Sequence, residues 1–124
     1  MLGVHAGGAA RAFPYEAVER ENLILDRVGS EPVLLVVGPD NQSVRVFSRA
    51  RPGGKGVADF YRTNDGANPM LDSLGGSKWN FQGCAGEGPA PGACLAPIDA
   101  LKDYWFDWRE YNPGTTVYGI APRP

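Results

Sequence analysis

The segment Asp103-Tyr104-Trp105-Phe106-Asp107-Trp108-Arg109-Glu110-Tyr111 contains five of the thirteen aromatic residues of this chain of 124 residues. Burying one large aromatic side chain contributes a few kcal/mol, because apolar burial stabilises a fold by roughly 25 cal/mol per Å². We therefore expect residues 103–111 to anchor the hydrophobic core. As a short helix, the segment would place Tyr104, Trp108 and Tyr111 on one face and leave Trp105 at its margin.

The length and composition are those of one globular domain. We expect residues 1–124 to form a single domain that is a module or fragment of a longer chain. The 17 Gly and 11 Pro residues interrupt the sequence too often for long helices. The net charge of −2 gives no attraction to nucleic acid or to anionic lipid. The longest apolar run, residues 33–37, is much shorter than the roughly 20 residues that span a bilayer, so we expect no membrane span.

The start of the chain predicts a hairpin followed by a helix. Residues 2–5 and 9–13 are short β-compatible runs on either side of a Gly-Gly pair, which is typical of a tight hairpin turn. Pro14 suits the first turn of a helix, and residues 15–22 after it carry apolar side chains at helical spacing.

The rest of the chain predicts further short strands. Residues 33–37 form a continuous apolar run, which is typical of a strand buried on both faces, and they should pair with the alternating residues 43–49. Residues 59–62 and 115–120 are additional strand candidates, whereas residues 97–102 could form one or two helical turns.

Trp79 and Phe81 are expected on one face of a strand, against which the aromatic segment 103–111 would pack. There is no internal repeat and no alternation of strands with long helices. We therefore expect a mainly β (α+β) fold, one compact domain of mostly antiparallel short strands with two small helices.

Four groups of residues follow one another along the chain in a recognisable order. They are residues 8–14, residues 24–26, residues 76–83 with Gly88-Pro89 and Gly92 ahead of Leu95, and residues 104–108 with residues 112–118. Together they resemble a bacterial family of domains of unknown function, DUF3179. The resemblance implies a family but no activity.

This chain departs from the resembled pattern at two places. Many family members have a Cys-Pro-Leu-Cys-Gly segment after the apolar strand and a His-Glu pair at the end of the first helix, which implies a thiolate and imidazole site. Here the first place holds residues 37–41, Val-Gly-Pro-Asp-Asn, and the second holds Glu21-Asn22. The resemblance implies a branch that lacks any metal or redox role based on those groups, and we expect no cofactor.

Cys84 and Cys94 flank a segment rich in Gly and Pro. A disulfide is our leading interpretation, because closing so short a loop contributes roughly 2–3 kcal/mol and would favour a periplasmic or extracellular parent protein. Free thiols in a cytosolic protein are a second interpretation. A metal pair is a third, but four-coordinate zinc needs two more ligands and the chain has one histidine, His5.

No catalytic motif is present, so we favour a structural or binding module over an enzyme. One alternative is a module that binds carbohydrate or another small ligand through exposed tryptophans. The candidate ligand-binding residues are Trp79, Trp105, Asp107 and Arg109.

A further alternative is an enzyme whose site lies near the loop from Gly83 to Gly92 and uses His5, or Asp107 with Arg109. The carboxylates of Asp103 and Asp107 could also form the acid pair of a glycosidase, although local hydrogen bonding is the simpler role for Asp107.

Overall fold

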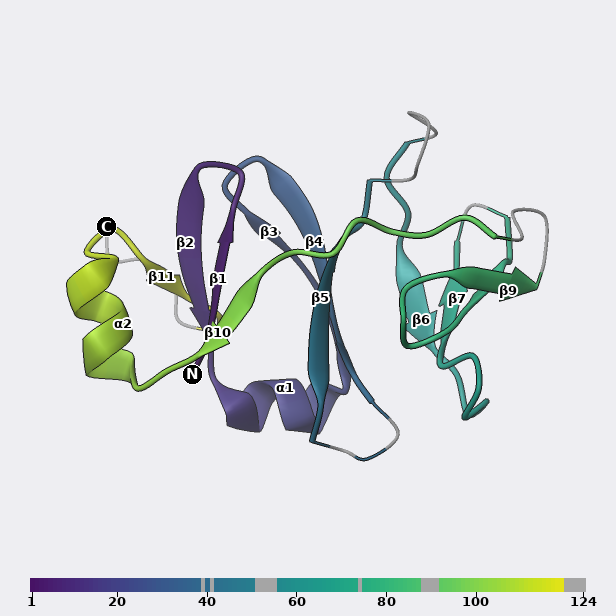
Figure 1. Cartoon of the computed structure of the whole chain (residues 1–124), viewed down its shortest axis with the longest axis horizontal. Coiled ribbons are helices and arrows are strands. Elements are labelled where there is room, and N and C mark those ends of the chain that lie inside the picture. The colour runs from purple at the N-terminus through teal and green to yellow at the C-terminus, as the bar shows by residue number, and fades with distance from the viewer. Residues whose placement is uncertain (39, 41, 51–55, 74, 88–91, 120–124) are drawn as a thin grey trace.

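Three small β-sheets lie side by side along the long axis of the molecule (Figure 1). The computed structural model describes residues 1–38, 40, 42–50, 56–73, 75–87 and 92–119. Every strand pairing is antiparallel except that of β11 with β2. The mainly β fold with two small helices is therefore confirmed.

The first sheet has the strand order β10-β1-β2-β11, the central sheet has the order β3-β4-β5, and the third has the order β6-β7-β8-β9. The strands are β1 (Leu2–Ala6), β2 (Ala9–Phe13), β3 (Leu23–Val28), β4 (Glu31–Val37), β5 (Val44–Ser48), β6 (Phe60–Arg62), β7 (Met70–Asp72), β8 (Lys78–Trp79), β9 (Ala85–Glu87), β10 (Ala100–Lys102) and β11 (Thr116–Val117). The helices are α1 (Tyr15–Glu21) and α2 (Trp105–Tyr111).

The predicted N-terminal hairpin and helix are confirmed. Gly7 and Gly8 connect β1 to β2 with φ values of 55° and 76°, a left-handed conformation that glycine adopts without a steric penalty. Helix α1 follows Pro14 and ends at Asn22, whose left-handed backbone (φ 64°) is typical of a helix C-terminus.

Strand β4 is the centre of the fold, and its predicted burial on both faces is confirmed. Val33, Leu35 and Val37 face the first sheet in a core that includes Val4 and Phe13. The alternate side chains of β4, Leu34 and Val36, face the third sheet in a second core that includes Phe60, Met70 and Trp79. A continuous apolar run is therefore needed, because neither face of β4 contacts water.

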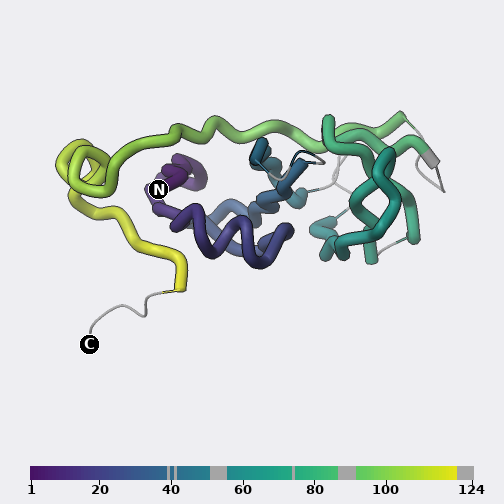
Figure 2. The backbone as a smooth tube through the Cα atoms, turned by 90° about the horizontal axis from the view of Figure 1, so that it is seen from below, coloured from purple at the N-terminus to yellow at the C-terminus, as the bar shows by residue number. Residues whose placement is uncertain are grey.

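The prediction of helical turns at residues 97–102 is wrong, because the chain is extended there. The backbone N–H of Ser48 donates to the carbonyl of Ala96 at 2.9 Å, and that of Ile98 donates to Val46 at 2.9 Å. Further on, β10 pairs with β1. The segment satisfies backbone groups at the edges of both sheets, which a helix would leave unpaired. Figure 2 shows it as part of an extended stretch of chain that leads from the third sheet to α2.

The second helix forms as predicted, but its predicted packing partner is wrong. Trp108 is the buried side chain of α2, and its ring lies against Gly3 of β1. Trp79 belongs to the third sheet, at the other end of the molecule (Figure 1). Tyr104 and Tyr111, expected on the buried face, are 74% and 83% exposed.

Two other expectations are corrected. Phe81 lies in the turn after β8, so it does not share a strand with Trp79, although both contact the same core. The last strand is limited to Thr116–Val117 and pairs in parallel with β2, while Ile120 lies outside the described residues.

Candidate functional site

Trp79 contributes to the core of the third sheet. Its side chain is fully buried, its indole N–H donates to Asp72 Oδ2 at 2.8 Å, and its ring meets Phe60 edge to face at 5.7 Å. All of its polar and apolar surface is used within the protein. Trp79 therefore offers no surface for stacking on a ligand.

Trp105, Asp107 and Arg109 lie together on α2. Trp105 and Asp107 are half-buried and Arg109 is exposed. The carboxylate of Asp107 and the guanidinium of Arg109 have no hydrogen-bond partner among the described residues. The helix lies at the opposite end of the molecule from the segment around Gly83, so the structure does not bring these groups together (Figure 1).

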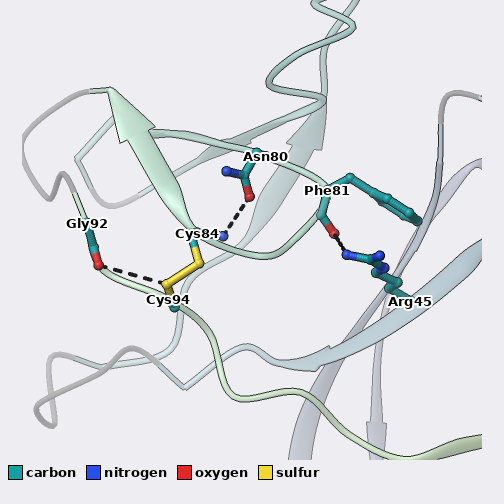
Figure 3. Close-up of a disulfide and its surroundings, with 6 residues drawn as sticks. All are labelled: Arg45, Asn80, Phe81, Cys84, Gly92 and Cys94. Carbon is teal, nitrogen blue, oxygen red and sulfur yellow. Dashed lines mark hydrogen bonds between the residues drawn. A yellow bond between two sulfur atoms is a disulfide. The ribbon is translucent and has the colours of Figure 1, made fainter.

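Cys84 and Cys94 form a disulfide, which confirms the leading interpretation of the pair (Figure 3). The two residues face each other as an antiparallel bridge. On either side of it, Ala85 N–H donates to Ala93 O at 2.7 Å and Leu95 N–H donates to Gly83 O at 2.8 Å. The bond therefore joins two extended segments that the backbone has already aligned.

The turn before the disulfide is attached to the central sheet by one arginine. Arg45 of β5 lies 4.4 Å from the centre of the Phe81 ring, and its Nη1 donates to the Phe81 carbonyl at 3.3 Å (Figure 3). Arg49, which is nearly buried, also connects layers by donating to Val33 O and pairing with Asp59 at 3.2 Å. Arg45 thus links β5 to the turn after β8, and Arg49, directly after β5, links β4 to the residue before β6.

An open groove lies between the tip of the first hairpin and the end of α2. We call it the hairpin groove, and its volume is about 660 Å³. Its size is within the range of small-molecule sites, roughly 300–1,000 Å³. It is lined by residues 5–10 and 111–115.

His5 and Asn112 form the polar centre of the hairpin groove. The Asn112 Nδ2 group donates to the Trp108 carbonyl at 3.0 Å, so its Oδ1 faces His5 Nε2 at 2.5 Å. Because Oδ1 can only accept, Nε2 of His5 carries the proton in this arrangement. A neutral imidazole then keeps Nδ1 as a hydrogen-bond acceptor, and the ring rests 4.8 Å from that of Trp108.

The sequence did not predict this groove. Sequence patterns predict a site for His5 beside the Gly83 loop and a place in the core for Tyr111, whereas the structure places both at the hairpin groove. One sequence feature could have indicated the groove, namely the polar turn Asn112-Pro113-Gly114 directly after the aromatic segment. It could not be interpreted without knowing that β1 lies beside that turn.

Among the described residues, no group of three or more His, Cys, Asp or Glu side chains is placed to hold a metal ion. No helix within the described part of the chain is long and apolar enough to cross a membrane.

Fold and site together define a small, disulfide-containing β domain with an open polar groove at one end. The chain belongs to the family described as protein of unknown function (DUF3179), whose model matches residues 1–115. Comparisons with curated proteins and with solved structures gave no match.

The two places where the sequence departs from the resembled family pattern are adjacent in the fold. The backbone N–H of Val37 donates to the carbonyl of Asn22 at 2.9 Å, joining the end of β4 to the end of α1. The neighbouring Arg62 donates from Nη1 to Val37 O at 2.6 Å. In this chain the junction presents carboxylate, amide and guanidinium groups in place of thiols and imidazole.

Proposed function

We propose that this domain is a non-catalytic binding module that holds a neutral polar ring, such as a carbohydrate, in the hairpin groove. The observation that carries the proposal is Tyr111, an 83% exposed aromatic side chain bordering a groove that contains hydrogen-bonding groups. An aromatic face beside polar groups is suited to a sugar, which has one apolar face and a rim of hydroxyls.

The lining of the groove favours an uncharged ligand. Among the residues that the structure describes, this lining has no Asp, Glu, Lys or Arg side chain, and residues 6–10 of the lining are small apart from their backbone polar groups. Asn112 has hydrogen-bonding capacity left, because Nδ2 keeps a second N–H and Oδ1 a second lone pair. Nδ1 of a neutral His5 can accept from a ligand hydroxyl. These groups recognise hydroxyls without a formal charge.

The residues at the junction of α1 and β4 support the proposal that the module is non-catalytic. Glu21-Asn22 and Val37-Gly38 occupy the places where the resemblance implies imidazole and thiolate groups. The disulfide supports a parent protein in an oxidising compartment, the periplasm or the cell exterior, because such bonds persist there. We further propose that residues 1–124 are one module of that parent chain.

The test is titration of the isotope-labelled protein with the methyl glycosides of glucose, galactose, mannose and N-acetylglucosamine. We expect at least one of them to cause saturable shifts of the Gly7, Gly8 and Gly114 amide signals. Replacing Tyr111 by Ala should weaken that binding about tenfold, because the stacking surface is removed.

The matched control is Tyr104→Ala, which removes an equally exposed ring from the region of the same helix but not from the groove. It should bind like the original protein. Equal weakening by both substitutions, or the absence of saturable shifts with all four glycosides, would show that the groove is not a carbohydrate site.

A further inference from the structure

A second pocket, independent of the hairpin groove, lies where α1 ends against the connection from β6 to β7. We call it the Arg62 pocket, and its volume is about 520 Å³. It shares no residue with the hairpin groove. Its lining consists of Glu21, Asn22, Arg62, Thr63, Asn64, Asp65, Gly66 and Pro69.

The guanidinium of Arg62 is anchored at this pocket by one hydrogen bond. Its Nη1 donates to the Val37 carbonyl at 2.6 Å, which uses one of its five N–H donors. The side chain has no ion-pair partner among the described residues, and the residue is exposed. Arg62 thus presents an exposed positive charge with free N–H donors, which can bind a carboxylate through two hydrogen bonds.

Two carboxylates of the same pocket are also fixed in place. Asp65 Oδ1 accepts from the backbone N–H groups of Ala67 at 2.9 Å and Asn68 at 3.3 Å, and these hydrogen bonds lower the pKa of Asp65. Glu21 Oε1 accepts from the hydroxyl of Tyr118 at 2.8 Å. Burial, followed by this contact with Glu21, raises the pKa of Tyr118, so the phenol remains a donor at neutral pH.

The second oxygen of Glu21 has only a long contact, 3.9 Å from Arg20, whose side chain is 72% exposed. An exposed pair at that distance contributes little, so Oε2 is available to a cation. The side-chain amides of Asn22 and Asn64 have no hydrogen-bond partner among the described residues. They can both donate and accept, and so they suit either end of a charged ligand.

We propose that the Arg62 pocket binds a small zwitterion of the free amino acid type, with its carboxylate on Arg62 and its ammonium group on Glu21 and Asp65. The lining carries one cation and two carboxylates. A simple anion would meet two like charges, and a simple cation would meet Arg62. A ligand with both charges is attracted at each end, and the pocket has room for a short side chain beside them.

Glycine is the probe for this proposal. Two derivatives of glycine that each lack one of its two charges are the comparison ligands. N-acetylglycine keeps the carboxylate without the ammonium charge, and glycinamide keeps the ammonium without the carboxylate. We expect glycine at millimolar concentration to cause saturable shifts of the Asn64, Asp65 and Gly66 amide signals. Both relatives should bind at least about tenfold more weakly, since each loses one charge-assisted contact.

Arg62→Gln should remove glycine binding, whereas Arg27→Gln, at an exposed arginine on β3, should leave it unchanged. Glu21→Gln can still accept from Tyr118 and should remove the preference for glycine over N-acetylglycine. This second variant keeps the test decisive even if Arg62→Gln is poorly folded.

Three results would overturn the proposal. These are no saturable shift with glycine, glycine binding that survives Arg62→Gln, and N-acetylglycine binding as tightly as glycine. Because the signals of Gly7 and Gly114 report the hairpin groove separately, failure at this pocket does not bear on the carbohydrate proposal.

Discussion

At the scale of single residues, the contact between Gly3 and Trp108 determines where α2 docks. The indole ring lies over the backbone of Gly3, and its N–H donates to Thr115 Oγ1 at 2.8 Å. Trp108 is thereby attached on one side to β1 and on the other to the turn that lines the hairpin groove. The position of Asn112 and Tyr111 at the groove follows from this docking.

Replacing Gly3 by Ala should destabilise the protein by about 1–3 kcal/mol, the usual cost of overpacking a filled site. The new Cβ would lie 2.3 Å from the Trp108 ring, so the helix has to move. Chemical denaturation followed by tryptophan fluorescence measures the change. Gly66→Ala is the control, because a Cβ there meets nothing within 4 Å and its free energy of unfolding should change little.

If Gly3→Ala had the same stability as Gly66→Ala, α2 would not be packed on β1 as described. Trp108 fluorescence gives an independent check, because an indole displaced from a buried site shifts its emission to longer wavelength.

At the scale of elements, the third sheet has the shortest strands and depends on cross-links. Its strands contain two or three residues each, too few for stability on their own. The core around Trp79 joins it to β4, Arg45 attaches its turn to β5, and the disulfide closes its last segment. Each of these contacts adds stability that the few backbone hydrogen bonds of such short strands do not supply.

Replacing both Cys84 and Cys94 by Ala should lower the free energy of unfolding by roughly 2–3 kcal/mol, because the unfolded chain gains the freedom of a loop that was closed. Urea denaturation with and without a reductant measures it. The reductant should destabilise the original protein by a similar amount and leave the double variant unchanged. Insensitivity of the original protein to reductant would contradict a stabilising disulfide.

At the scale of the whole molecule, the fold is a stack of layers in which the central sheet contacts both neighbours. Arg11 of β2 connects the first layer to the central one. Its Nε donates to Asp26 Oδ2 of β3 at 2.7 Å, and its Nη1 donates to Thr116 Oγ1 of β11 at 2.9 Å. The paired side chains are only 20% and 22% exposed, so water replaces the contact poorly.

Arg11→Met should destabilise the protein by about 1–3 kcal/mol, because Asp26 is left partly buried without its cation. Adding Asp26→Leu to the same protein should recover much of the loss by removing the uncompensated charge. The free energy of unfolding of the two single variants and the double variant gives this comparison. Arg27→Met, at an exposed position, should be nearly neutral. Additive losses at Arg11 and Asp26 would contradict the pairing.

Local chemistry was sufficient to predict several elements. The Gly-Gly pair predicted the first hairpin, Pro14 and the apolar spacing predicted α1, and the continuous run in residues 33–37 predicted a strand with two buried faces. The residues flanking 103–111, with the stop at Asn112-Pro113-Gly114, predicted a helix but not its partner. In each case the sequence pattern that carries the prediction lies within a few residues along the chain.

What only the tertiary structure decided is which segments meet. Residues 97–102 are extended because the edges of β5 and β1 offer unpaired backbone groups, which no local pattern reveals. Trp79 and Trp108 are both buried, yet in different layers, and Tyr111 is left to border the hairpin groove. The sequence by itself determined the β-rich class and the family, and it favoured a disulfide that the structure then showed. Contacts between segments distant in the sequence determined both pockets: Trp108 docks on Gly3 at the hairpin groove, and Arg62 bonds to Val37 at the Arg62 pocket.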